Sequence, residues 1–520
     1  MLNKIIGFSI KNKLIIGLMT LMLIIWGLWS ATKLPIDAVP DITNNQVQIF
    51  TSCPTLAGQE VEQLVTYPIE QSIANLPDLV ELRSISRFGL SVITAVFDDK
   101  VDIYFARQLV NERLQEAESQ IPPGIGTPEL APVSTGLGEI YQYIIHPKPG
   151  SESKYNAMDL RTMQEWIVAR QLYGTAGIAE VNSFGGLLKQ YEVSVNPDKL
   201  KGMGVTISEI FQALVNNNEN TGGAYIDKKP NAYFIRGIGL VSSFDDINNI
   251  VVKNNPNGIP ILIRDVADVG LGNAIRYGAL TFNGENEAVG GIVMMLKGAN
   301  SADVVTRVKE KMETIQRSLP DDIIIEPYLD RTDLVKRAIA TVEKNLIEGA
   351  LIVIFVLVVF LGNLRAGLIV ASAIPLSMLF ALGLMHVFGV SANLMSLGAI
   401  DFGLIVDGAV IIVEATLFYL ESKKSTNPLL QSEMDMAVQS SASRMMNSAI
   451  FGQVIIMIVY FPILSLVGIE GKMFRPMAQT VSFAIIGAML LSLTYIPMMC
   501  ALFLPKQLKH KKTFADKMMG

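Results

Sequence analysis

The stretch AIDFGLIVDGAVIIVEA, residues 399–415, carries three carboxylic acids, Asp401, Asp407 and Glu414, in an otherwise apolar sequence. In a soluble protein it would be read as a buried strand or helix with misplaced acids. Near the centre of a membrane-spanning helix, each ionised Asp costs roughly 2.5 to 3.5 kcal/mol on insertion scales, and intramembrane acids are usually functional. Whether this stretch lies in a soluble core or in a membrane therefore determines which role its acids can have.

The composition indicates a membrane protein. Half of the 520 residues are hydrophobic and only 17% are charged, which is too apolar for an ordinary soluble chain. A membrane-spanning helix needs about 20 apolar residues. Six runs are almost free of charge: residues 14–32, 349–362, 366–385, 387–413, 445–469 and 476–505. The second run is short, but the helical pattern before it would extend the helix. We predict a multi-pass α-helical membrane protein with six transmembrane helices.

The loop charges predict the orientation, because Lys and Arg concentrate in cytoplasmic loops. With the N-terminus inside, the short outer loops hold little beyond Lys472 and Arg475. The cytoplasmic side receives Lys4, Lys11, Lys13, Arg365, Lys423, Lys424, Arg444, Lys506, Lys509, Lys511 and Lys512. The first run could instead be a cleaved signal peptide, but it is long for one and no clear cleavage site is present. The expected layout is a cytoplasmic N-terminus with helix one (1–32), an external region (33–340), helices two to six (341–505) and a basic cytoplasmic tail (506–520).

The external region alternates strand-like and helix-like segments. Strand patterns at 47–52, 79–86 and 90–97 and helical patterns at 59–75 and 102–120 predict a split-βαβ, ferredoxin-like α+β unit at 33–135. A comparable series predicts a second unit at 136–340, with strands at 139–146 and 289–296 and helices at 158–172 and 302–318. Its Asn- and Gly-rich middle, about 185–275, is expected to be an inserted subdomain.

Other classes of site find little support. Cys53 and Cys500 lie in different regions and the three histidines are scattered, so the sequence predicts neither a disulfide nor a Cys/His metal site. The net charge of −6 and the lack of a basic aromatic patch argue against nucleic acid as a partner.

Several ordered motifs resemble one family: DITNNQVQI (41–49), RSISRFGLS (83–91), TGLGEIYQY (135–143), GGIVMMLKG (290–298), GNLRAG (362–367) and SANLMSLGAI (391–400). Together they resemble the heavy-metal efflux branch of the resistance–nodulation–division (RND) transporters. The resemblance implies a proton-driven exporter in the bacterial inner membrane, neither an enzyme nor dependent on a cofactor. It also implies a homotrimer with a periplasmic adaptor protein and an outer-membrane channel. The external region would then be two periplasmic porter subdomains, with a docking subdomain inserted in the second.

The chain differs from this family in length. Family members contain a second half of similar architecture, whereas this chain stops after the sixth predicted helix. We therefore expect it to be the N-terminal half of a transporter, functional only with its C-terminal half.

The acids have a spacing that suits proton transfer. On one continuous helix over 393–414, Asp407 and Glu414 share a face about 10 Å apart, and Asp401 lies about 9 Å the other way, rotated by some 120°. A low-dielectric medium favours the protonated form of a carboxyl group, so such a series can pass protons across the membrane core. Gly403 and Gly408 would let a neighbouring helix approach closely.

The alternative is that these acids are structural and pair with a buried cation. The other apolar runs contain no internal Lys or Arg, because Lys344, Arg444 and Arg475 stand only at predicted helix ends. The acids must then be protonated, solvated or paired with another chain. In the resembled family a lysine from the second half completes the relay, so we favour a proton relay.

The resemblance also implies a substrate. The pattern DFG…DGA…E is similar to that of divalent-cation exporters, for zinc, cobalt, cadmium and nickel. Copper and silver exporters carry methionines along the route, but most of the 24 methionines here fall in apolar runs, where Met is ordinary packing. Ala415 stands where the family usually has Asn. A periplasmic metal site should use oxygen ligands; Glu139 and Glu165 are the candidates, although an exposed acid is more often only a solvated surface group.

Two further readings stay open. Drug-exporting RND pumps share the implied fold but carry two adjacent aspartates, whereas Ile400-Asp401-Phe402 has one. A half-length chain could also be a non-transporting remnant or an assembly scaffold.

Overall fold

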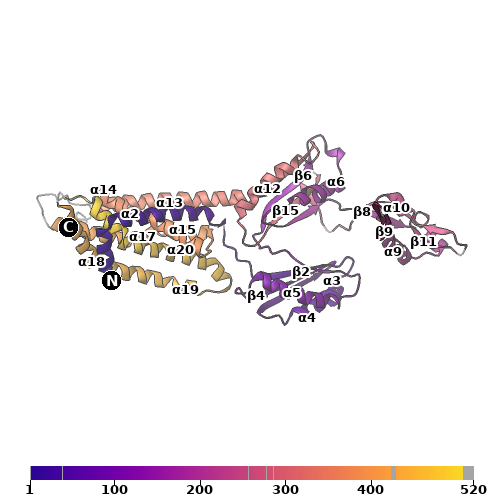
Figure 1. The fold of residues 1–520 in the computed structure, drawn as a ribbon, viewed down its shortest axis with the longest axis horizontal. Helices are drawn as coiled ribbons and strands as arrows, with labels where there is room; N and C mark the ends of the chain where they lie inside the picture. Colours follow the sequence, from indigo (N-terminus) through magenta and orange to yellow (C-terminus); the bar gives the residue numbers. More distant parts are fainter. Residues whose placement is uncertain are drawn as a thin grey trace.

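The computed structural model describes residues 2–506 except 38, 256, 277, 285 and 423–428. The molecule is elongated, with a helix bundle at one end, two α/β units in the middle and a smaller unit at the far end (Figure 1). Most of the predicted basic tail, residues 507–520, and the predicted cytoplasmic Lys423 and Lys424 lie outside the described residues.

The bundle contains the apolar helices. They are α1 (Leu2–Lys11), α2 (Lys13–Lys33), α13 (Arg331–Leu361), α14 (Leu364–Ala371), α15 (Ala373–Val387), α16 (Leu394–Gly398), α17 (Phe402–Ser422), α18 (Gln431–Val459), α19 (Phe461–Leu464), α20 (Gly468–Leu493) and α21 (Tyr495–Phe503). Within the described residues, six helical spans are long and apolar enough to cross a membrane. The predicted six-helix membrane fold is confirmed.

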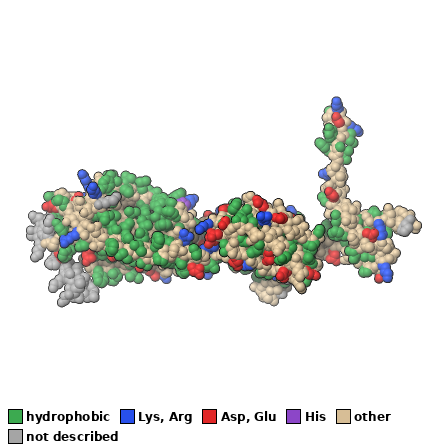
Figure 2. Space-filling model, turned by 90° about the horizontal axis from the view of Figure 1, so that it is seen from below, with side chains coloured by type: hydrophobic (Ala, Val, Ile, Leu, Met, Phe, Trp, Pro, Cys, Tyr) green, Lys and Arg blue, Asp and Glu red, His purple; other side chains and the backbone are tan. Residues whose placement is uncertain are grey.

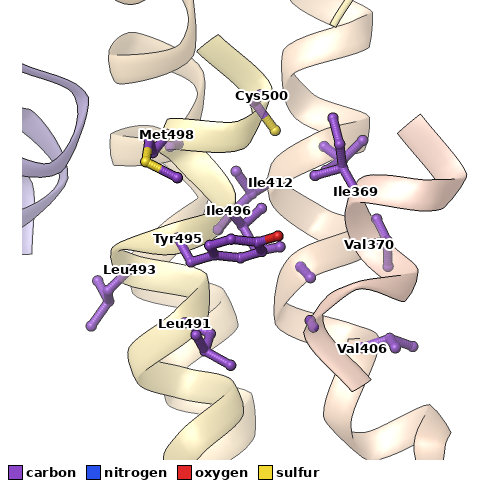
Figure 3. Packing of buried hydrophobic residues seen from close by; sticks show 14 of the residues in the cluster. Ile369, Val370, Val406, Ile412, Leu491, Leu493, Tyr495, Ile496, Met498 and Cys500 are labelled. Atoms are coloured by element: carbon purple, nitrogen blue, oxygen red, sulfur yellow. The ribbon is translucent and has the colours of Figure 1, made fainter. Parts of the chain in front are cut away.

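The bundle has an apolar interior and an apolar exterior. Ile369 of α14, Ile412 of α17 and Ile496 of α21 belong to one buried cluster (Figure 3). By contrast, only 17% of the most apolar part of α2 and 6% of that of α13 are buried. Figure 2 shows a broad hydrophobic surface on the face of the bundle turned to the viewer. Such a surface is unfavourable in water and is accommodated in hydrocarbon, so the bundle is built for a bilayer.

The first α/β unit is a four-stranded antiparallel sheet in the order β3-β4-β2-β5. Its elements are β2 (Gln46–Ser52), α3 (Gly58–Val61), a π-helical turn (Glu62–Thr66), α4 (Tyr67–Ile73), β3 (Leu79–Arg87), β4 (Leu90–Phe97), α5 (Ile103–Glu118) and β5 (Pro128–Leu130). Asp102 starts α5 by accepting the backbone N–H groups of Tyr104 and Phe105. Ile69 and Val110 from the helices and Ile49 from the sheet are fully buried between the two layers.

The second unit has a five-stranded sheet in the order β14-β15-β6-β16, with β7 also paired to β15. Its elements are β6 (Glu139–Pro147), α6 (Ala157–Met163), a π-helical turn (Gln164–Ala169), α7 (Arg170–Leu172), β7 (Ile178–Gly185), β14 (Leu280–Phe282), β15 (Asn286–Met295), α12 (Ser301–Gln316) and β16 (Ile323–Asp330). β16 leads directly into α13, so this sheet continues into a membrane-spanning helix.

The smaller unit lies between β7 and β14 in the chain and has a core of its own, which includes Ile210, Ile247 and Ile263. Its elements are β8 (Lys189–Val195), α8 (Pro197–Met203), α9 (Ile207–Asn216), β9 (Thr221–Lys228), β10 (Asn231–Gly237), α10 (Phe244–Asn248), β11 (Val251–Asn254), β12 (Pro260–Leu262), α11 (Ile263–Val266) and β13 (Ala267–Asn273). Every residue of the β9–β10 hairpin is exposed. The hairpin forms the narrow arm that stands out from the molecule in Figure 2.

Candidate functional site

α17 presents two different faces. Ile405, Ala409 and Ile412 face the bundle core and are each 1% exposed or less. Asp407 and Glu414 lie on the opposite, exposed face of the helix. Residues seven apart return to the same side of an α-helix, so both carboxylates lie on one side of α17.

The prediction of one continuous helix over 393–414 is wrong. α16 ends at Gly398 and α17 begins at Phe402. Asp401 stands just before α17, and its Oδ1 accepts the backbone N–H of Gly403 at 2.8 Å. An Asp side chain competes for backbone N–H groups in this way, and a negative charge is favourable at a helix N-terminus. Asp401 therefore has a capping role, and the spacing derived for it from a straight helix does not apply.

Asp407 and Glu414 have no such role. Within the described part of the chain, neither carboxylate takes part in a hydrogen bond or an ion pair. Among the same residues, no cation is paired with Asp401 either. The expectation that this chain does not neutralise its own intramembrane acids therefore agrees with the geometry.

The basic residues expected at helix ends lie elsewhere. Because α18 begins at Gln431, Arg444 lies in the interior of that helix and is exposed. Lys344 and Arg475 likewise lie inside α13 and α20. The helices extend beyond the apolar runs, so the ends of the runs were poor guides to the ends of the helices.

Gly408 allows close packing, as predicted. A Cβ atom at Gly408 would lie 2.7 Å from Gln453 Nε2 of α18 and 3.0 Å from Ser492 Oγ of α20. Gln453 and Ser492 are each 1% exposed, and neither atom has a hydrogen-bond partner among the described residues. The sequence reasoning missed this polar pair, although Gln453 within an apolar run was a visible signal. At Gly403 only Asp401 lies near the Cβ position in the described residues, so the close approach expected there stays a prediction.

Contacts near the start of the first α/β unit tie it to the bundle. Strand β1 (Ile36–Asp37), which follows α2, pairs in parallel with β17 (Ala392–Asn393), which precedes α16. Lys472 of α20 bonds to the Asp99 carboxylate at 2.7 Å and to the Thr43 carbonyl at 3.0 Å. The span formed by α16 and α17, which carries the acids, is therefore attached at its start to the segment that leads into the first α/β unit.

The two predicted metal ligands lie in the second α/β unit. Glu139 begins β6 and accepts a hydrogen bond from Gln142 Nε2 at 2.6 Å. Glu165 forms an ion pair with Arg161 at 2.8 Å. Burial and the nearby Glu139 carboxylate raise the pKa of Tyr328. In the described residues no three His, Cys, Asp or Glu side chains are grouped to hold a metal ion, so a metal role for Glu139 and Glu165 stays a prediction.

The chain is similar to known proteins along nearly its whole length. A model of the AcrB/AcrD/AcrF family matches residues 5–519. The cobalt-zinc-cadmium resistance protein CzcA of Cupriavidus metallidurans is 47% identical, covering 98% of this chain and 48% of that protein. The cation efflux system protein CusA of Escherichia coli is 36% identical, covering 96% of this chain and 48% of that protein.

A solved structure agrees with these relatives. The crystal structure of a heavy metal efflux pump matches at a TM-score of 0.83 and 35% identity, covering 95% of this chain and 48% of that chain. This chain thus spans about half the length of the curated relatives it matches. Because the family model, the relatives and the fold agree over almost every residue, the chain belongs to the AcrB/AcrD/AcrF family, in the heavy-metal efflux branch of the RND transporters.

Proposed function

We propose that this chain is one half of a proton-driven antiporter that exports divalent heavy-metal cations of the zinc, cobalt, cadmium and nickel class from the bacterial cell envelope. The observation that carries the proposal is the exposed pair Asp407 and Glu414 on α17, which lacks a partner in the described residues. An ionised acid in hydrocarbon is costly unless it takes up a proton, is solvated or meets a cation. A carrier can alternate between the two states, with its acids protonated in one and ionised and solvated in the other.

The exposed face of α17 supports the need for a second half. Asp407, Glu414 and Phe418 lie on that face, while the opposite face is fully packed. A second helical half that covers this face would remove the acids from lipid, and a lysine on it would supply the missing positive charge. We infer that transport requires this complement.

Divalent cations are favoured by the relatives and by the packing of methionine. Identity is 47% with a protein named for cobalt, zinc and cadmium resistance and 40% with one named for nickel and cobalt resistance. Met434, Met446 and Met498 are each 3% exposed or less and belong to the apolar core of the bundle. Buried methionines of this kind act as packing rather than as a soft-metal route.

The external units support the expected assembly. On this proposal the two α/β units are periplasmic porter subdomains, the smaller unit is the docking subdomain, and the bundle lies in the inner membrane. Tyr225, Phe234 and Ile235 on the β9–β10 hairpin are half or more exposed. An exposed apolar hairpin is suited to contact with another protein. It supports a homotrimer that also meets an adaptor protein and an outer-membrane channel.

Metal tolerance in cells tests the substrate. A metal-sensitive bacterium that expresses this chain with a six-helix complement should grow in more zinc, cobalt or cadmium than cells with the complement alone. No gain is expected against silver or hydrophobic drugs. A gain against silver alone would contradict the divalent class, and a gain against drugs would support the drug-pump reading. If no condition improves while the protein is present and folded, the scaffold reading holds.

A further inference from the structure

A groove lies at the start of α14. Figure 1 shows α14 at the end of the bundle that is farthest from the α/β units. The groove has a volume of about 700 Å³ and lies between the start of α14 and the end of α21. Its walls are mostly apolar and include Leu368, Met499, Leu502 and Phe503. Leu368, Leu502 and Phe503 are each 43% exposed or more. The described residues therefore do not cover these apolar side chains.

Two cations stand on the rim of this groove. Arg365 and Lys506 line it and are both exposed. Among the described residues neither side chain forms an ion pair. Two positive charges beside an open apolar wall match a molecule with a negative head and an apolar tail.

The backbone holds both cations in place. The Asn363 side chain accepts the N–H of Arg365 at 3.0 Å and so fixes the first turn of α14. The carbonyl of Lys506 accepts the N–H of Leu429 at 3.1 Å. Because both positions are anchored, a ligand that binds them need only order the two side chains.

The position along the bundle agrees with this chemistry. α18 begins at this end, where Gln431 donates to the Ala501 carbonyl of α21. Lys13 and Asp435 form an ion pair there at 2.7 Å, which is the charge expected at a membrane surface. Basic pockets between membrane helices on the cytoplasmic side recognise anionic lipid headgroups. We propose that this groove binds one anionic phospholipid of the cytoplasmic leaflet, with its phosphate between Arg365 and Lys506 and an acyl chain along Leu368 and Phe503.

Native mass spectrometry of the full chain in detergent can count bound lipids. Phosphatidylglycerol and phosphatidylcholine with identical acyl chains are added in turn, and the first should bind more tightly. Arg365→Gln and Lys506→Gln should each weaken phosphatidylglycerol binding about fivefold, and together about 25-fold. Lys11→Gln is the matched control, because Lys11 is an exposed cation at the end of α1 and outside the groove. It should leave the first bound lipid unchanged.

A second variant tests the apolar wall. Leu368→Trp fills the groove and keeps both charges, so it should reduce lipid binding while glycerol phosphate, which has no tail, still binds as weakly as before. Circular dichroism and gel filtration confirm that each variant is folded. Equal binding of the two lipids, an equal loss with Lys11→Gln, or no loss with Leu368→Trp would overturn the proposal. The last result would mean that the bound lipid does not lie along Leu368. This test does not depend on transport.

Discussion

Arg331, the first residue of α13, holds the carboxylate of Asp37 with its guanidinium, at 2.9 Å from Nη2 to Oδ1. The same guanidinium donates to the carbonyl of Leu137, and the Arg331 side chain is only 8% exposed. Asp37 in turn belongs to the strand that pairs with Asn393 before α16. One side chain therefore joins three segments: the start of α13, the segment before the second sheet and the strand attached to the acid-bearing span.

Removing this contact should be costly. Arg331→Gln loses charged hydrogen bonds in a nearly buried site, and we expect a loss of stability of about 2 kcal/mol. Thermal unfolding in detergent measures it. Asp37→Asn alone should also destabilise, and the double variant should cost less than the sum of the single ones, since both remove one contact. Additive costs would show that the two side chains act independently.

Gly408 should tolerate no side chain. In Gly408→Ala the new methyl group meets Gln453 and Ser492, and overpacking of this kind costs about 1 to 3 kcal/mol. Gly452→Ala is the control on the neighbouring helix, because nothing lies within 4 Å of its Cβ position. Unfolding midpoints of the two variants are compared in the same detergent. Equal midpoints would mean that α17 and α18 adjust without cost.

Asp330 should make the start of α13 sensitive to acid. Burial alone would raise its pKa, but the Lys309 ammonium and the Thr332 N–H outweigh burial and lower it. The folded state then favours the ionised acid, so the stabilisation is complete above the unfolded pKa of about 3.9 and is lost as the pH falls through the lower folded pKa.

Amide exchange tests this dependence. The protection of the Thr332 amide, corrected for its intrinsic exchange rate, should fall in wild-type protein as the pH drops below about 4. Asp330→Asn keeps a capping side chain and removes the charge, so its protection should change little over that range. Parallel curves for both proteins would show that the ionisation of Asp330 has no role there.

The orientation can be tested with thiol labels. Cys53 and Cys500 are both buried, so added cysteines should dominate the reaction with an impermeant maleimide on intact spheroplasts. Asn216→Cys, exposed on α9, should be labelled, and Lys11→Cys, exposed at the end of α1, should be labelled only after lysis. Lys511, which the sequence also places on the cytoplasmic side, lies outside the described residues. Labelling of both sites in intact cells would contradict the six-helix topology.

Structural features that depend on a single helix or strand were predicted well. The apolar runs located the six membrane spans found in the described residues, because hydrocarbon selects for length and composition. The strand pattern of β2 and the helical pattern of α5 were equally clear, since each buries one face against the same core.

Features that depend on local hydrogen bonds or on neighbours were not predicted. The break at Asp401 results from a side chain that bonds to Gly403 N–H, which no apolar pattern reveals. The pairing of Asp37 with Asn393 and the contact of Gly408 with Gln453 join residues far apart in the sequence. Only the folded chain shows such contacts.

The central claim is that Asp407 carries protons that drive metal export. The most direct measurement is zinc flux in vesicles that hold this chain with its complement, under an imposed pH gradient. Asp407→Asn keeps the shape of the side chain and removes the proton that it can release, whereas Glu348→Gln changes an exposed acid of α13 that is paired with Lys344. We predict that Asp407→Asn abolishes proton-coupled zinc flux, that Glu348→Gln retains it, and that the chain without its complement shows none. Wild-type flux in Asp407→Asn, in protein that still assembles, would contradict the account.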